Sequence, residues 1–117
     1  MQYKNRIVGA TKTEHFTAKQ NSIAALAKAL GHPARVAIVE YLLSVDSCIC
    51  GDIVNELPLA QPTVSQHLKE LKSAGIIKGE IEGNSICYCV DETAIEKLQS
   101  YFASVAAVLN SKKSACC

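Results

Sequence analysis

The chain has 117 residues, which allows one domain with a modest hydrophobic core. Its net charge of +1 argues against a protein that coats nucleic acid indiscriminately, so any DNA contact has to be local. No run approaches the length of a membrane span, and residues 1–12 lack the apolar segment of a secretion signal. We therefore expect a single cytoplasmic domain with no membrane association.

Two helices are predicted in the first part of the chain, after a flexible N-terminal arm at residues 1–19. The first helix spans residues 22–30, with Ser22 or Asn21 as its N-cap. The second spans about residues 33–44 and opens with a proline, which fits the first turn of a helix because its missing N–H is harmless there.

Two polar residues stand at the start of the second helix. We interpret His32 as a helix-start residue rather than a metal ligand. Arg35 falls in the first turn, where a cation opposes the helix dipole. Arg35 is therefore expected to have an acidic or phosphate partner.

The most informative stretch follows, because it predicts a helix-turn-helix. Residues 52–57 form a short amphipathic helix, and residues 58–61 are long enough only for a tight turn into the next helix. That next helix has Pro62 in its first turn and ends at Gly75. One side of it is apolar, with residues recurring at helical spacing: Val64, Leu68 and Leu71.

A β-hairpin is predicted directly after this helix. Residues 76–82 and 85–90 flank a Gly83-Asn84 turn of the hairpin type. In the second strand, alternation sets one group of side chains (Ile86, Tyr88, Val90) against another (Ser85, Cys87, Cys89). A recognition helix followed by a hairpin is the arrangement of a winged helix-turn-helix. The expected fold class is therefore mainly α with a small β-hairpin.

The last predicted helix follows a cap at Asp91 or Thr93 and keeps one apolar stripe over more than three turns. The stripe consists of Ile95, Leu98, Phe102, Val105 and Val108 or Leu109. An apolar stripe of that length needs a surface to cover it, and the hydrophobic core formed by the rest of the chain is small. We expect a homodimer in which the first and last helices pack across a two-fold axis; the alternative is a lid within one chain.

Six cysteines occur as three close pairs: Cys48/Cys50, Cys87/Cys89 and Cys116/Cys117. In a reducing compartment, thiols are more often ligands or sensors than structural disulfides. Cys48 and Cys50 are predicted to lie at the start of the third helix, where the dipole favours the thiolate that soft ions bind. Cys87 and Cys89 fit a shared ion or two independent thiols better than a strained bridge along one strand. Any single cysteine is also compatible with a small buried hydrophobe.

The whole pattern resembles the ArsR-type winged-helix repressors. The resemblance covers roughly residues 20–110 and is carried by three segments: Leu-Gly-His-Pro-Ala-Arg at 30–35, Cys-Ile-Cys at 48–50, and Gln-Pro-Thr-Val-Ser-Gln-His-Leu at 61–68. It implies one DNA-binding and dimerisation domain over residues 20–110, followed by a cysteine-ending tail at residues 111–117. It also implies a homodimer that binds a palindromic double-stranded operator and leaves it when an inducer binds.

The residues expected to contact DNA lie on the recognition helix and the wing. Thr63, Gln66 and His67 are predicted to be exposed and to meet base edges, since a Gln amide pairs bidentately with adenine. Phosphate or mixed contacts are assigned to Gln61, Ser65 and Lys69. In the wing, Lys78 is the only cation, and Asn84 belongs to the tip. Ala60 stands where relatives place a capping Ser or Thr.

The resemblance also implies an inducer, trivalent arsenic or antimony, bound by Cys48 and Cys50, with no permanent cofactor. Arsenic takes three thiolates, and the third cysteine that some arsenic sensors place near residues 53–54 is missing here. Cys116 and Cys117 are our first candidates for the third thiolate, and Cys87 and Cys89 our second.

Two alternatives to the arsenic-responsive repressor remain. The same DNA-binding repressor could use its cysteines as a redox sensor or as a site for cadmium, lead or zinc. A thiol metallochaperone or oxidoreductase would require a Cys-x-x-Cys motif near a βαβ unit, and the sequence has neither. We find no set of nucleophile, base and orienting group, and therefore predict that the protein is not an enzyme.

Overall fold

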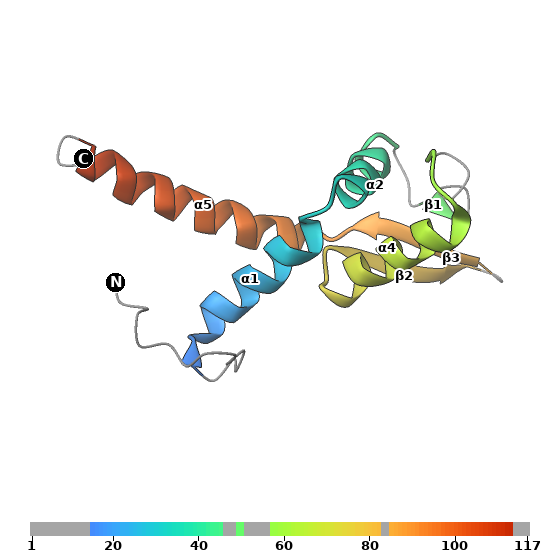
Figure 1. Ribbon diagram of the computed structural model, residues 1–117, viewed down its shortest axis with the longest axis horizontal. Helices are drawn as coiled ribbons and strands as arrows, with labels where there is room; N and C mark the ends of the chain where they lie inside the picture. Colours follow the sequence, from blue (N-terminus) through green and yellow to red (C-terminus); the bar gives the residue numbers. More distant parts are fainter. Residues whose placement is uncertain (1–14, 46–48, 51–56, 83–84, 114–117) are drawn as a thin grey trace.

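The computed structural model describes residues 15–45, 49–50, 57–82 and 85–113. The elements, in chain order, are α1 (Ala18–Leu30), α2 (Pro33–Leu43), β1 (Ile49–Cys50), α4 (Gln61–Ser73), β2 (Ile77–Glu82), β3 (Ser85–Val90) and α5 (Glu92–Lys112) (Figure 1). The short helix predicted at residues 52–57 lies outside the described residues apart from Leu57. Helices pack on a small sheet, which confirms the predicted fold class.

Local capping determines where the helices begin. α1 begins before the predicted residue 22, because Thr17 and Gln20 form a capping box in which each side chain accepts from the other residue's N–H at 3.0 Å. For α2, His32 is the N-cap as predicted, and its Nδ1 accepts from the Ala34 N–H at 3.0 Å. Asp91 caps α5 by accepting from the Thr93 N–H.

The sheet has three strands, in the order β1-β3-β2, and both pairings are antiparallel. The predicted hairpin is confirmed as β2 and β3, but the sequence did not indicate β1. Ile49 lies opposite Tyr88, and Cys50 lies opposite Cys87. Cys50 therefore belongs to a strand, which corrects its predicted place at the start of a helix.

The core lies where α1, α2, α4 and the start of α5 meet the sheet. Its buried side chains include Ile38 of α2, Leu71 of α4 and Ile77 of β2. On β3, Tyr88 and Val90 pack against this cluster. Cys87 is fully buried but does not belong to the cluster, since alternation along a strand turns it to the other side.

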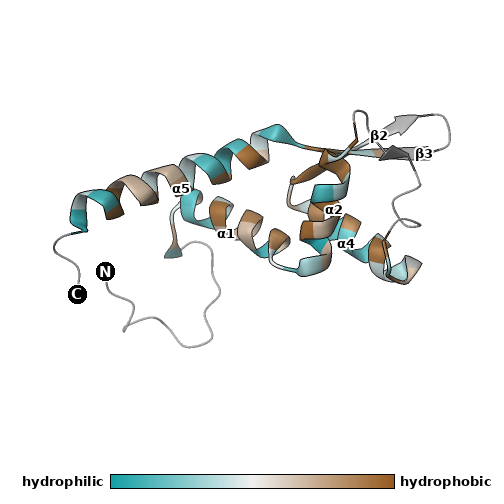
Figure 2. Cartoon of the chain, turned by 90° about the horizontal axis from the view of Figure 1, so that it is seen from above, coloured by the Kyte–Doolittle hydropathy of each residue, from teal (hydrophilic) through white to brown (hydrophobic). Residues whose placement is uncertain are grey.

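α1 and α5 extend away from this body (Figure 1). The Cα radius of gyration is 17.7 Å, whereas a compact chain of this length would have about 13 Å. Hydrophobic and hydrophilic residues alternate around both helices (Figure 2). Four large apolar side chains of α5 are exposed: Ile95, Phe102, Val108 and Leu109. Among the described helices, none is both long and apolar enough to span a membrane.

Candidate nucleic-acid interface and thiol site

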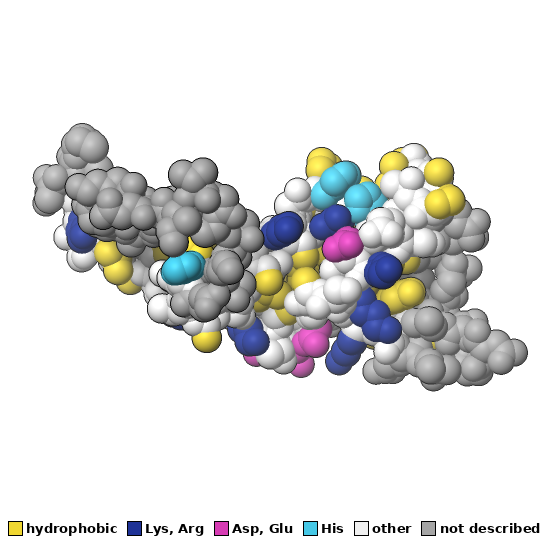
Figure 3. Space-filling view, turned by 60° about the horizontal axis from the view of Figure 1, so that its bottom comes forward, with side chains coloured by type: hydrophobic (Ala, Val, Ile, Leu, Met, Phe, Trp, Pro, Cys, Tyr) yellow, Lys and Arg dark blue, Asp and Glu magenta, His cyan; other side chains and the backbone are white. Residues whose placement is uncertain are grey.

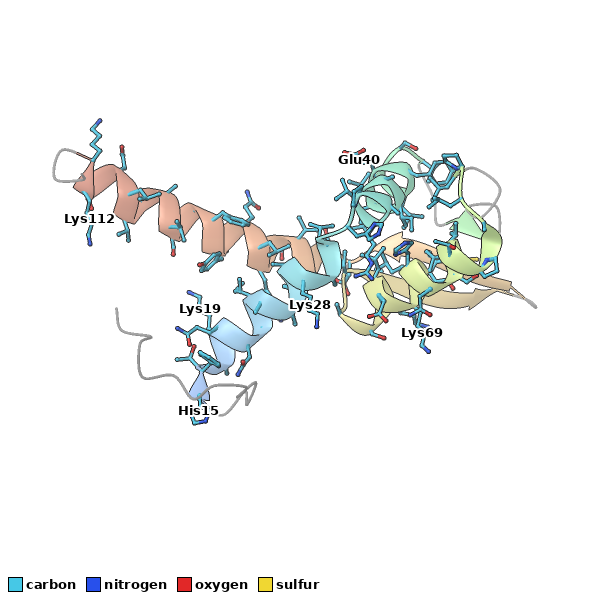
Figure 4. The ribbon with its side chains drawn as sticks, in the orientation of Figure 1. His15, Lys19, Lys28, Glu40, Lys69 and Lys112 are labelled. Atoms are coloured by element: carbon cyan, nitrogen blue, oxygen red, sulfur yellow. The ribbon has the colours of Figure 1, made fainter. Side chains whose placement is uncertain are left out.

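α4 presents a polar face to solvent because its apolar stripe is fixed in the core. Val64 and Leu71 have no exposed surface, whereas Thr63, Ser65, Gln66 and Lys69 are exposed. Lys and Arg side chains are spread among polar atoms on one face of the body (Figure 3), and Lys69 projects from α4 in Figure 4. An exposed polar helix face of this kind is what a recognition helix requires.

The two ends of α4 differ in how they are capped. Ala60 is the N-cap, and no side-chain hydrogen bond caps this end. Gly75 adopts φ = 84°, a left-handed conformation that glycine enters without a steric penalty. It turns the chain directly into β2, so the orientation of the wing follows from that of α4.

The Gln66 amide is held in place along the helix. Its Nε2 donates to Oε2 of Glu70, one turn later, at 3.0 Å. An amide nitrogen carries two N–H groups, so this bond uses one of them and orients the group.

His67 does not lie on the exposed face, and the prediction that it does was wrong. Its side chain is 8% exposed, and its Nδ1 accepts a hydrogen bond from Nε of Arg35 at 3.1 Å. The helical stripe around Val64, Leu68 and Leu71 is broad enough to include residue 67, which turns the imidazole toward α2. His67 is therefore part of the α2–α4 contact.

Arg35 lies in a compact cluster with two histidines, whereas we expected an acidic or phosphate partner. Besides His67, it donates through Nη1 to the carbonyl oxygen of Ala29 at 3.1 Å. The rings of His32 and His67 are in contact, with centroids 4.4 Å apart and ring planes tilted by 51°. Burial lowers the pKa of His67 below its ordinary value, and the neighbouring His32 and Arg35 lower it further. The neutral imidazole is the form that accepts the Arg35 hydrogen bond.

Of the other predicted DNA-contacting residues, Lys78 lies on β2 and is exposed. Gln61 is the first residue of α4, but its side chain is outside the described part of the structure. Asn84 also lies outside the described residues. The Arg35–His67 contact was not predicted, because nothing in the local pattern links residues that are 32 positions apart.

Two cysteine positions that are far apart in the sequence lie opposite each other in the sheet. The β1–β3 pairing sets Cys50 opposite Cys87, and Cys89 follows two residues later on the same strand. Cys87 and Cys89 are both disulfide-bonded, whereas we expected two independent thiols or a shared ion at these positions. Among the described side chains, no three potential metal ligands group together. The remaining predicted ligands, Cys48, Cys116 and Cys117, lie outside the described residues.

Comparison with known proteins identifies related regulators. The model of the arsR family of bacterial regulatory proteins matches residues 32–78. The chain is 44% identical over 63 residues to the HTH-type transcriptional repressor SmtB of Mycobacterium tuberculosis (strain CDC 1551 / Oshkosh), a match covering 54% of this chain and 46% of that protein. The chain thus spans about half the length of this relative. It is 38% identical over 85 residues to a cadmium resistance transcriptional regulatory protein CadC homolog of Staphylococcus aureus, covering 69% of each.

Solved structures show the same fold. An ArsR-like transcriptional regulator from Rhodococcus sp. RHA1 matches with a TM-score of 0.73 and 19% identity, over 85% of this chain and 92% of that one. The homodimeric winged helix-turn-helix DNA-binding domain of Mb0332 from Mycobacterium bovis matches with a TM-score of 0.59 and 24% identity, over 94% and 96%. These relatives are regulators and not enzymes, and the chain belongs to the ArsR family of bacterial regulatory proteins, with a winged helix-turn-helix fold.

Proposed function

We propose that the protein is a homodimeric, DNA-binding transcriptional repressor that leaves its operator when a thiophilic ion binds its cysteine thiolates. The observation that carries this proposal is the exposed polar face of α4, whose opposite face is anchored in the core. The relatives that are named repressors support the same function.

The geometry of α4 supports direct reading of bases. Thr63, Ser65 and Gln66 lie on its exposed first two turns, which is the part of a recognition helix that reaches base edges. The Gln66 amide, oriented by Glu70, would pair with adenine and contribute about 1–3 kcal/mol of discrimination. Lys69 and Lys78 would contact phosphates, as would Gln61 and Asn84 by their place in the sequence. His67 is not among the base contacts, because it is buried.

The exposed apolar side chains of α5 support a dimer. Phe102 is 60% exposed and Leu109 63% exposed, on a helix that projects beyond the body together with α1. In a dimer, two α4 helices would enter successive major grooves about 34 Å apart. A small change of angle between the subunits would then loosen both contacts together.

The inducer we propose first is trivalent arsenic or antimony, because thiolates are the preferred ligands of soft ions. Cys48 and Cys50 are the first two ligands, and Cys116 and Cys117 were the sequence-based candidates for a third. Cadmium is the second candidate, since a relative with 38% identity is named a cadmium resistance regulator. Zinc, or an oxidant acting on the same thiols, is a further outcome that one titration separates from these two.

That titration uses fully reduced protein on a fluorescent fragment of its own promoter, followed by anisotropy. Arsenite, antimonite, cadmium, zinc and peroxide are added in turn. Release by arsenite or antimonite at the lowest concentration supports the first inducer, and release by cadmium alone supports the second. If the reduced protein never binds the promoter fragment, the proposed function is wrong.

The DNA contacts are tested with paired lysine variants. Lys69→Ala should weaken binding to all sequences about equally and lower the salt slope of log K by roughly 0.9, the value of one phosphate contact. The control is Lys112→Ala, which removes the same charge at the far end of α5 (Figure 4). Equal effects of the two variants would contradict the placement of DNA on α4.

A further inference from the structure

Three basic side chains gather beside the recognition helix, where α1 ends and α2 begins. Lys28 lies in the last turn of α1, and His32 and Arg35 lie at the start of α2. Lys28 and His32 are exposed, and Arg35 is partly exposed. We call these three residues the basic corner. Figure 3 shows Lys, Arg and His side chains gathered over the body of the molecule, with fewer acidic ones among them.

The positive charge of Arg35 is not neutralised by its hydrogen-bond partners in the described part of the structure. Both of its side-chain hydrogen bonds go to neutral acceptors, Nδ1 of His67 and the carbonyl oxygen of Ala29. On α4, the Glu70 carboxylate accepts from the Gln66 amide. A guanidinium carries five N–H groups, so three donors and a full charge remain for an anion.

His32 adds an oriented donor next to this guanidinium. Its Nδ1 accepts from the Ala34 N–H at 3.0 Å, so the ring carries its proton on Nε2, at the opposite side of the imidazole. Because the side chain is exposed, this N–H can donate to an oxygen outside the chain. Guanidinium, imidazole N–H and ammonium groups are donors that phosphate oxygens accept from.

The basic corner flanks the part of α4 that we expect to read bases. Thr63 and His67 are four residues apart, so they lie on the same side of the helix. His67 is within 3.1 Å of Arg35, which places the start of α2 alongside that row. The major groove is about 12 Å wide and a helix with its side chains about 10–12 Å across. Phosphates therefore run along both flanks of a helix in the groove.

We propose that the basic corner binds phosphates of double-stranded DNA along one wall of the major groove that α4 enters. Lys28 of α1 and Lys69 of α4 point toward the same side of the molecule, at the lower edge of the view in Figure 4. The contact thus extends beyond the recognition helix and the wing, and it rests on the DNA-binding part of the proposed function. It carries no sequence information, because phosphates are the same at every base pair.

Lys28→Ala is the decisive variant, because this side chain is exposed and its removal leaves the core unchanged. It should lower the salt slope of log K by roughly 0.9 and weaken binding about eightfold at 0.1 M salt, the effect of one phosphate contact. The control is Lys19→Ala, an exposed lysine near the other end of the same helix (Figure 4). Lys19→Ala should bind as the parent does.

His32→Ser tests the start of α2 without removing its cap, since a serine oxygen also accepts from the first turn of a helix. Loss of the Nε2 donor should weaken binding about two- to tenfold, the usual contribution of one hydrogen bond. Arg35 is left intact, because its removal would also unpair the buried His67. Circular dichroism melts check that each variant is folded.

Each protein is titrated by anisotropy on its own promoter fragment and on a scrambled duplex of the same length, at the same salt concentrations. A phosphate contact requires that Lys28→Ala and His32→Ser weaken binding to both duplexes by the same factor. If folded His32→Ser weakens binding to the promoter alone, it acts by shifting α4, and its assignment to a phosphate is wrong.

Two further outcomes separate this inference from the proposed function. If the parent binds the promoter but Lys28→Ala and Lys19→Ala have equal salt slopes, the basic corner is refuted and the repressor function is not. If the parent binds neither duplex at any salt concentration, both are refuted.

Discussion

The missing cap at the start of the recognition helix gives a prediction that can be worked out from the structure. Ala60 has φ = −63° and ψ = 142°, which is already the extended conformation of an N-cap, and its side chain is exposed. Ala60→Ser should therefore add a capping oxygen without displacing any neighbour. The usual gain from such a cap is about 1 kcal/mol, with a range of about 0.5–2.

Two features of the helix place the expected gain at the low end of that range. A capping oxygen accepts from the second or third N–H of the helix, and Pro62 occupies the second position without an N–H. The third N–H, that of Thr63, already donates to the Ala60 carbonyl oxygen at 3.0 Å. Serine would share this N–H rather than satisfy an unused donor. We expect about 0.5–1 kcal/mol.

Thermal melts at one fixed protein concentration would measure the effect, since dimerisation makes the Tm concentration-dependent. For a chain of this size the Tm should rise by about 2–5 °C. Ala60→Val is the control, because it enlarges the side chain without adding an acceptor and should give no increase. A Tm for Ala60→Ser that equals that of Ala60→Val would refute the capping argument.

Three other substitutions test the rest of the structure. Gly75→Ala should cost about 1–2 kcal/mol in the free energy of unfolding, because alanine is strained at φ = 84° even though no atom crowds its Cβ; Gly75→Asn, which tolerates this conformation better, should cost less in the same denaturant titration. Because the pKa of His67 is lowered in the folded chain, the unfolded chain binds the proton more tightly than the folded chain does. The neutral imidazole therefore stabilises the fold fully above about pH 6.5, and this stabilisation is lost as the pH falls toward the lower folded-state pKa. His67→Gln should therefore reduce the loss of stability between roughly pH 7 and pH 5, whereas unchanged pH dependence relative to the parent would contradict the buried neutral imidazole. Phe102→Glu should convert the dimer to monomers in sedimentation equilibrium, because it places a charge on the exposed apolar face of α5; Ser73→Glu on α4 is the control, and a dimeric Phe102→Glu protein would exclude this face as the interface.

The helices and the hairpin could be predicted from local signals. Pro33 and Pro62 mark helix starts, Gly75 marks a helix end, and the apolar spacing in α4 and α5 matches the helical period. These signals act within a few residues of each other, so they are present in the sequence itself. The same holds for the polar face of α4 at Thr63, Ser65 and Gln66.

Only the tertiary structure decided the partners of residues that are far apart in the chain. The burial of His67 depends on its contacts with Arg35 and His32 at the start of α2, and the position of Cys50 opposite Cys87 depends on the register between β1 and β3. Periodicity shows which residues of one element share a face, but it does not say which second element covers that face. The starts of α2 and α4, the hairpin and the exposed positions Thr63, Ser65 and Gln66 therefore followed from sequence alone, while the α2–α4 contact and the register that sets Cys50 opposite Cys87 required the fold, because packing between distant segments fixes them.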